Sequence, residues 1–130
     1  MKNKLLRHDA RRTYSIILEA GDEVVRCLVA FARLEGLSRA EFSGLGDLKE
    51  VLLGCFELNG EPTVSVPISE QVGVASLIGN ILLSNGEPRV EPHAVLRTAD
   101  GGAWGGRLLE GHACPRLNIL LSASGWATSG

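Results

Sequence analysis

Residues 86–111 read GEPRVEPHAVLRTADGGAWGGRLLEG. Over 89–97 polar and apolar side chains alternate, which is the period of a strand with one buried face. Residues 98–102 contain Asp-Gly-Gly, a composition typical of a chain reversal. A second run with strand-forming residues, 103–109, follows directly. This stretch therefore predicts two antiparallel strands joined by a short loop.

The polar face of the first strand carries Glu91 and His93, about 6 to 7 Å apart by the rise of a strand. Such a pair suits two ligands of one metal ion, or a carboxylate that orients an imidazole. If all five residues of 98–102 form the loop, His93 lies opposite Arg107 and Glu91 is the diagonal neighbour of Arg107. A solvated polar strand face is the alternative, because polar neighbours are common on half-exposed strands.

The sequence before this stretch predicts one helix among further strands. From Val24 to Gly36 apolar residues recur at helical spacing, with Asp22 as the expected N-cap and Gly36 as the stop. Further strands are expected at the apolar and β-branched runs 13–18, 40–42, 51–56, 64–66, 72–83 and 117–121.

Glycine-containing turns divide this pattern. Residues 43–47, with two glycines, are expected to separate the strands 40–42 and 51–56. Asn59-Gly60 and Asn85-Gly86, each followed by Glu-Pro, predict hairpin turns. The predicted fold is mixed α/β of the α+β type: a central antiparallel sheet with one main amphipathic helix and short extra helices.

The run 72–83 is apolar almost throughout, which indicates a strand that is covered on both faces. A single sheet in a chain of 130 residues leaves one side in water. Packing against another subunit would supply the missing cover.

The composition predicts one compact domain with a core of its own. The chain has 130 residues, of which 45% are hydrophobic and 22% charged, and this excludes a wholly disordered, collagen-like or coiled-coil protein. No apolar run reaches the length of a membrane span or of a secretory signal, so we expect a cytoplasmic protein without membrane contact. The three cysteines fit neither a disulfide framework nor a paired-cysteine zinc motif and are expected to be buried or half-buried thiols: Cys27, Cys55 and Cys114.

The basic residues are concentrated at the start of the chain. The net charge is −2, yet five bases fall in the first twelve residues: Lys2, Lys4, Arg7, Arg11 and Arg12. The acidic remainder repels phosphate, so any DNA affinity is expected to be weak and to come from these bases. We expect 1–12 to be a mobile or partner-contacting basic arm, 13–123 the folded domain and 124–130 a C-terminal tail.

Three motifs in order, GEPRVEPHAVL at 86–96, Asp100-Gly101 and WGGRLLEG at 104–111, resemble the plants-and-prokaryotes-conserved (PPC) domain, and the similarity covers about 13–121. The resemblance implies a mixed α/β fold around an antiparallel sheet, assembled as a homotrimer. It also implies the stand-alone prokaryotic type, which is labelled a candidate DNA-binding protein. The AT-hooks of the plant members do not occur in this chain.

The resemblance also bears on metal binding. Many prokaryotic members carry a three-histidine metal site, and their fold is similar to that of acetolactate decarboxylase. At the corresponding positions this chain has Glu91, His93 and Arg107. A guanidinium offers no lone pair and repels a cation, so the site is expected to be degenerate, without zinc or another cofactor. We expect the charge of Arg107 to take the place of the metal and to meet Glu91 across the hairpin.

The function implied is that of a homotrimeric binding or regulatory module, and an enzymatic role is the less favoured interpretation. The alternative is a small-molecule enzyme or ligand-binding protein in which Arg107 clamps a carboxylate and His93 moves a proton. Trp104, set next to glycine, is expected to pack or to line that pocket or an interface. A third alternative is a purely structural trimer. The sequence names no ligand, DNA site or protein partner.

Overall fold

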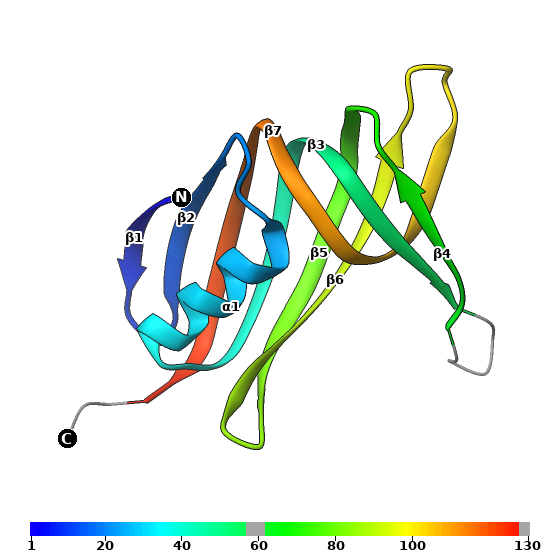
Figure 1. Cartoon of the computed structure of the whole chain (residues 1–130). Helices are drawn as coiled ribbons and strands as arrows, with labels where there is room; N and C mark the ends of the chain where they lie inside the picture. The colour runs from blue at the N-terminus through cyan, green and yellow to red at the C-terminus, as the bar shows by residue number, and fades with distance from the viewer. Residues whose placement is uncertain (57–61, 128–130) are drawn as a thin grey trace.

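The structure is a computed structural model that describes residues 1–56 and 62–127. Its elements in chain order are β1 (Lys2–His8), β2 (Arg12–Glu19), α1 (Val24–Glu35), β3 (Leu37–Phe56), β4 (Pro62–Ile68), β5 (Val72–Ser84), β6 (Glu87–Arg97) and β7 (Ala103–Trp126). The predicted antiparallel sheet with one main helix is confirmed (Figure 1). The predicted short extra helices are wrong for the described residues, in which α1 is the only helix.

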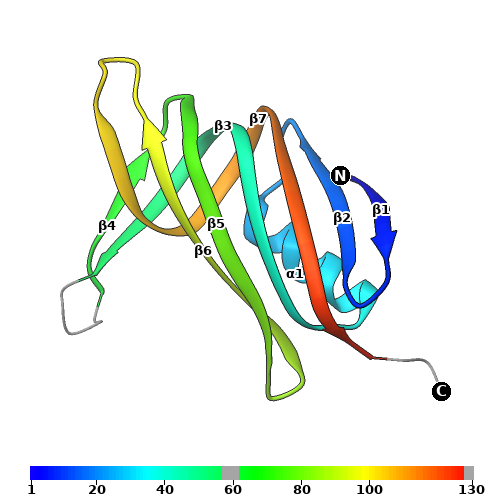
Figure 2. The ribbon, with the colours of Figure 1, turned by 180° about the vertical axis from the view of Figure 1, so that it is seen from behind.

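All seven strands belong to one sheet, and β3 and β7 are long enough to take part in it twice. The C-terminal half of β7 pairs with β2 and with the start of β3, whereas its N-terminal half pairs with β6 and with the end of β3. Because β3 also pairs with β5, and β5 with β6, these four strands curl round into a strongly bent sheet (Figures 1 and 2).

Gly46 explains why β3 continues where the sequence predicts a turn. The turn at 43–47 does not form; the strand runs on, with a shift of register between Gly44 and Gly46. Gly46 has a φ of 148°, and a Cβ there would lie 2.9 Å from the Cα of Leu117 and closer still to the carbonyl oxygen of Arg116. A glycine is needed for β3 to run this close to β7, where Gly46 pairs with Leu117. The sequence also predicts two separate strands at 103–109 and 117–121, but both runs belong to one strand, β7.

The helix packs its apolar stripe on the inner face of the sheet. Val24, Leu28 and Phe31 are fully buried, and the ring of Tyr14 on β2 meets Phe31 edge to face at 4.9 Å. The predicted end at Gly36 is confirmed, with that residue in the left-handed conformation at φ 64°. The core therefore lies between α1 and the concave side of the bent sheet.

The N-cap of α1 is Glu23, so the expectation of Asp22 is wrong. The Glu23 carboxylate accepts the backbone N–H groups of Val25 and Arg26, and also that of Gly111 on β7 at 2.9 Å. Its longer side chain reaches both partners from a position where the chain is still extended. Asp22 instead accepts the backbone N–H of Glu19 at 2.9 Å.

Both ends of the chain contribute to strands. In the basic segment, for which a mobile or partner-contacting arm is expected, β1 pairs with β2 from Lys2, opposite Ile17, to His8, opposite Arg12. At the other end β7 extends to Trp126, three residues beyond the predicted end of the domain at 123. Lys2, Lys4 and Arg7 therefore lie on the edge strand β1, whereas Arg11 lies in the turn after it and Arg12 on β2.

The Asn85-Gly86 hairpin is confirmed, with φ angles of 53° and 80°, the signs required by a type I′ turn. The turn predicted at Asn59-Gly60 lies outside the described residues, as does the side chain of Cys55. Cys27 and Cys114 are half-buried free thiols, and burial raises the pKa of Cys27. Among the described residues the structure contains no helix with the length and hydrophobicity that a membrane span requires.

Candidate functional site

The face of the sheet turned away from α1, here called the outer face, is assembled row by row from the strand register (Figure 2). Residues that pair directly on neighbouring strands present their side chains on the same face. One such row crosses six strands and consists of Lys4, Ser15, Leu120, Ser43, Ile78, His93 and Arg107. The row therefore joins the basic edge strand, an apolar centre and the predicted site residues on one surface.

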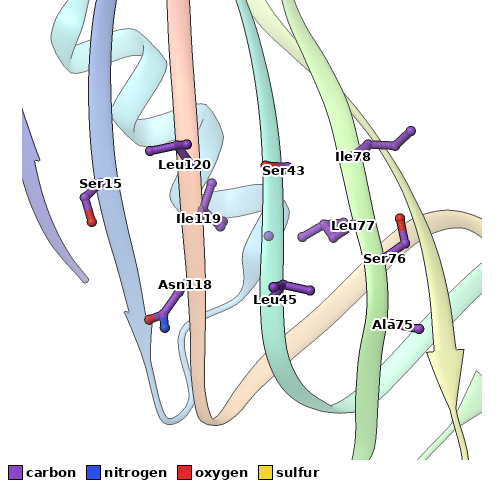
Figure 3. Close-up of a pocket in the computed structure, with 11 residues that line it drawn as sticks. Ser15, Ser43, Leu45, Ala75, Ser76, Leu77, Ile78, Asn118, Ile119 and Leu120 are labelled. Atoms are coloured by element: carbon purple, nitrogen blue, oxygen red, sulfur yellow. The ribbon is translucent and has the colours of Figure 1, made fainter. Parts of the chain in front are cut away.

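A shallow apolar hollow of about 490 Å³ occupies the centre of the outer face (Figure 3). Leu45, Ile78 and Leu120 line it, with exposed fractions of 63%, 56% and 52%. The polar side chains around them are small or uncharged: Ser15, Ser43, Ser76 and Asn118. Large apolar side chains gathered at one exposed place indicate a contact or ligand surface.

The predicted register of the hairpin is confirmed. His93 pairs directly with Arg107, because all five residues of 98–102 form the loop. The Asp100 carboxylate accepts hydrogen bonds from the Thr98 hydroxyl and from a backbone N–H in this loop. These bonds hold the pKa of Asp100 below its usual range. A loop held in this way fixes which residue of β7 faces His93.

Glu91 lies between two arginines on the outer face. The Nε atom of Arg89 is 3.0 Å from Oε1 of Glu91, and Nη2 of Arg107 is 3.9 Å from the same oxygen. The second distance is an ion-pair separation and exceeds the range of a hydrogen bond. Because Glu91 is 41% exposed, these pairs contribute only about 0 to 1 kcal/mol to stability.

These residues do not fit a metal ion. A guanidinium has no lone pair to donate, and that of Arg107 stands beside Glu91, one of the two groups that could coordinate; the other, His93, pairs with Arg107 across the strands. A cation placed between them would meet a fixed positive charge. No step of metal chemistry is therefore assigned to this site.

Trp104 lies apart from the site. It pairs with Leu96, whose side chain is buried, so Trp104 is on the opposite face from His93. There it lines a smaller hollow of about 260 Å³ together with residues 66–70. The structure thus brings Glu91, His93 and Arg107 together and excludes Trp104 from them.

The five N-terminal bases have different surroundings. Lys2 and Lys4 are exposed and pair with outer-face residues of β2, and Arg7 forms an ion pair of 2.8 Å with Asp9. Arg11 donates to the hydroxyl of Ser122 at 2.9 Å.

Arg12 differs from the other four bases because its guanidinium stacks over the Trp126 ring at 4.3 Å. The His8 ring packs against the same indole in a T-shaped arrangement, with the ring centroids 5.7 Å apart. Arg12 therefore has a packing role at the end of the core, and the accessible positive charge comes from the remaining four.

The sequence analysis did not identify the central hollow. Its lining comes from four strands that are distant along the chain, β2, β3, β5 and β7. The apolar residues Ile78 and Leu120, in outward positions of their strands, were the available signal.

Comparisons with known proteins agree with this fold. A family model described as the Plants and Prokaryotes Conserved (PCC) domain matches residues 7–124. A plant- and prokaryote-conserved (PPC) protein from Pyrococcus horikoshii is 30% identical, with 94% of this chain and 81% of that chain covered and a TM-score of 0.79. None of the curated proteins compared with the chain matches it.

Two further solved structures share the fold at lower identity. A candidate DNA-binding protein from Bacteroides thetaiotaomicron is 21% identical, covering 93% of this chain and 83% of that chain, with a TM-score of 0.79. A metal-containing protein from Archaeoglobus fulgidus is 23% identical, covering 97% and 86%, with a TM-score of 0.78.

Proposed function

Because the chain belongs to the Plants and Prokaryotes Conserved (PCC) domain family, we propose that it is a homotrimeric binding module whose copies meet through the outer face of the sheet. The observation that carries this proposal is the exposed group of Leu45, Ile78 and Leu120 on three neighbouring strands. Full burial of one such side chain stabilises an assembly by about 1.5 to 3 kcal/mol. A lone chain leaves all three in water.

The test compares two changes of an exposed apolar residue to aspartate, one on the outer face and one on α1. Ile78→Asp places a charge beside the hollow, and Leu34→Asp places one on α1, where Leu34 is 78% exposed. We expect Ile78→Asp to reduce the molar mass measured by light scattering, because a charge would have to be buried. Leu34→Asp should leave the mass unchanged. Equal masses for both variants would refute the outer face as the interface.

DNA association is the second part of the proposal. The relative from Bacteroides is described as a candidate DNA-binding protein. In this chain the surface suited to phosphate is the edge strand β1 with the turn that follows it, carrying Lys2, Lys4, Arg7 and Arg11. Because these contacts would reach phosphates and the rest of the chain is acidic, binding is weak and has little sequence preference.

A further inference from the structure

The charges at the β6–β7 end of the outer face do not balance. Arg89 and Arg107 both approach the same oxygen of Glu91, at 3.0 and 3.9 Å. A guanidinium has five N–H donors in a planar fork, and Glu91 lies too far from Arg107 to accept a hydrogen bond from it. Two cationic side chains thus face one carboxylate, and the formal charges of these three side chains sum to +1. His93 pairs with Arg107 across the two strands.

The neighbouring strand adds no further acid directly beside these groups. On β5, Asn80 pairs with Glu91 and Ile78 pairs with His93, which supplies an amide and an apolar side chain. The next acid in the row is Glu41 on β3, two strands away from Glu91 and so roughly 9 to 10 Å from it by strand spacing. At physiological salt a repulsion over that distance through solvent is largely screened.

Arg107 is the most shielded of the three charged side chains. Its side chain is 28% exposed, against 41% for Glu91 and 61% for Arg89. A partly shielded guanidinium binds an anion better than a fully hydrated one, because less water opposes the contact. Glu91 is 41% exposed and exposed ion pairs are weak, so another anion can displace it from Arg107.

We propose that Arg107, Arg89 and His93 form a binding site for one small oxyanion, a carboxylate or a phosphate group, for which Glu91 is the internal competitor. The site goes beyond the proposed assembly and does not depend on it. A bound oxyanion accepts from the Arg107 fork, with Arg89 and the His93 ring as further donors. When no ligand is bound, Glu91 lies beside Arg107, and a ligand has to displace it, which lowers the affinity of the site.

The experiment is a nuclear magnetic resonance titration that follows the arginine Nε–H signals of the full chain. Sodium phosphate in one arm and sodium acetate in the other replace sodium chloride at constant ionic strength. We expect the Arg107 and Arg89 signals to shift and to saturate in at least one arm, and the two arms distinguish the two oxyanions. Arg97, exposed on β6 and outside the cluster, is the internal control.

Two variants make the proposal falsifiable. Glu91→Gln removes the competitor and should tighten binding about two- to fivefold, the factor that corresponds to an exposed ion pair. Arg107→Gln should abolish the saturable shift of the Arg89 signal. Light scattering on the same samples shows separately whether the assembly has changed. Absence of a saturable shift in both arms overturns the site. A shift of Arg97 equal to that of Arg107, or weaker binding by Glu91→Gln, overturns it as well.

Discussion

Arg107 lies directly opposite His93 across β6 and β7, with its Nη2 atom 3.9 Å from Oε1 of Glu91. This arrangement puts a permanent cation where a third metal ligand would have to stand. These three side chains therefore distinguish this chain from a metal-binding protein of the same fold, even where the two folds are closely similar.

The first prediction concerns zinc. Protein purified without chelator should contain well under one zinc per chain, because a guanidinium repels the ion. Changing Glu91→His and Arg107→His together should raise the zinc content toward one per chain by supplying three nitrogen ligands with His93. Arg107→Gln alone is the control, since it removes the charge without adding a ligand. Elemental analysis decides, and stoichiometric zinc in the unmodified protein would contradict the account.

Gly46→Ala should be strongly destabilising. A methyl group there would overlap the backbone of β7, so we expect a loss of about 3 kcal/mol or more in the free energy of unfolding. Gly101→Ala is the matched control, because Gly101 also has a positive φ, 87°, but its Cβ would meet open space. It should lose only about 1 kcal/mol. Urea unfolding at one protein concentration measures both losses, and similar values would show that the close approach of β3 to β7 at Gly46 is not the cause.

Glu23→Ala should weaken the junction between α1 and β7. The Glu23 carboxylate accepts two helix N–H groups and that of Gly111, and its loss should lower the free energy of unfolding by about 1 to 2 kcal/mol. Glu35→Ala, at the other end of the helix, should change the free energy of unfolding by only a few tenths of a kcal/mol, in the stabilising direction, because alanine has the higher helix propensity. The two variants should therefore differ in the midpoint of thermal unfolding. Equal midpoints would rule out a capping role.

Weak DNA binding should depend on four bases at the β1 edge. The test variant replaces these with glutamine: Lys2, Lys4, Arg7 and Arg11. A matched control replaces four exposed bases elsewhere: Arg26, Lys49, Arg97 and Arg116. Arg12 stays in both, because it packs on Trp126.

Fluorescence anisotropy with duplex DNA at several salt concentrations measures the effect. The unmodified protein should show a log–log salt slope of about −3 to −4 if all four bases reach phosphates, and the test variant a slope near zero. An equal loss of affinity in the control would place the DNA surface elsewhere. A strong preference for one DNA sequence would contradict readout through phosphates alone.

Local patterns in the sequence were sufficient for the helix and for the hairpin that carries the site. The alternation in 89–97 and the five-residue loop set the register, and register alone brings His93 opposite Arg107. The end of the helix at Gly36 follows from its left-handed backbone. Each of these features depends on residues that are close together along the chain.

The errors arose where distant segments decide the structure. The glycines of 43–47 are compatible with a turn, and only the position of β7 beside Gly46 shows that this glycine permits a close approach of two paired strands. The basic segment forms a strand because it pairs with the edge of β2, and no local pattern in the sequence indicates this pairing. The central hollow could not be predicted for the same reason: its lining residues lie on β2, β7, β3 and β5 and come together only when these strands pair.

The central claim is that copies of the chain assemble through the apolar outer face. The most direct test is the molar mass of the unmodified protein in solution, by light scattering at micromolar concentration. The account predicts about 41 kDa, three times the 13.8 kDa of one chain. A mass of 13.8 kDa under these conditions would contradict it, because Leu45, Ile78 and Leu120 would then remain in water with no copy to cover them.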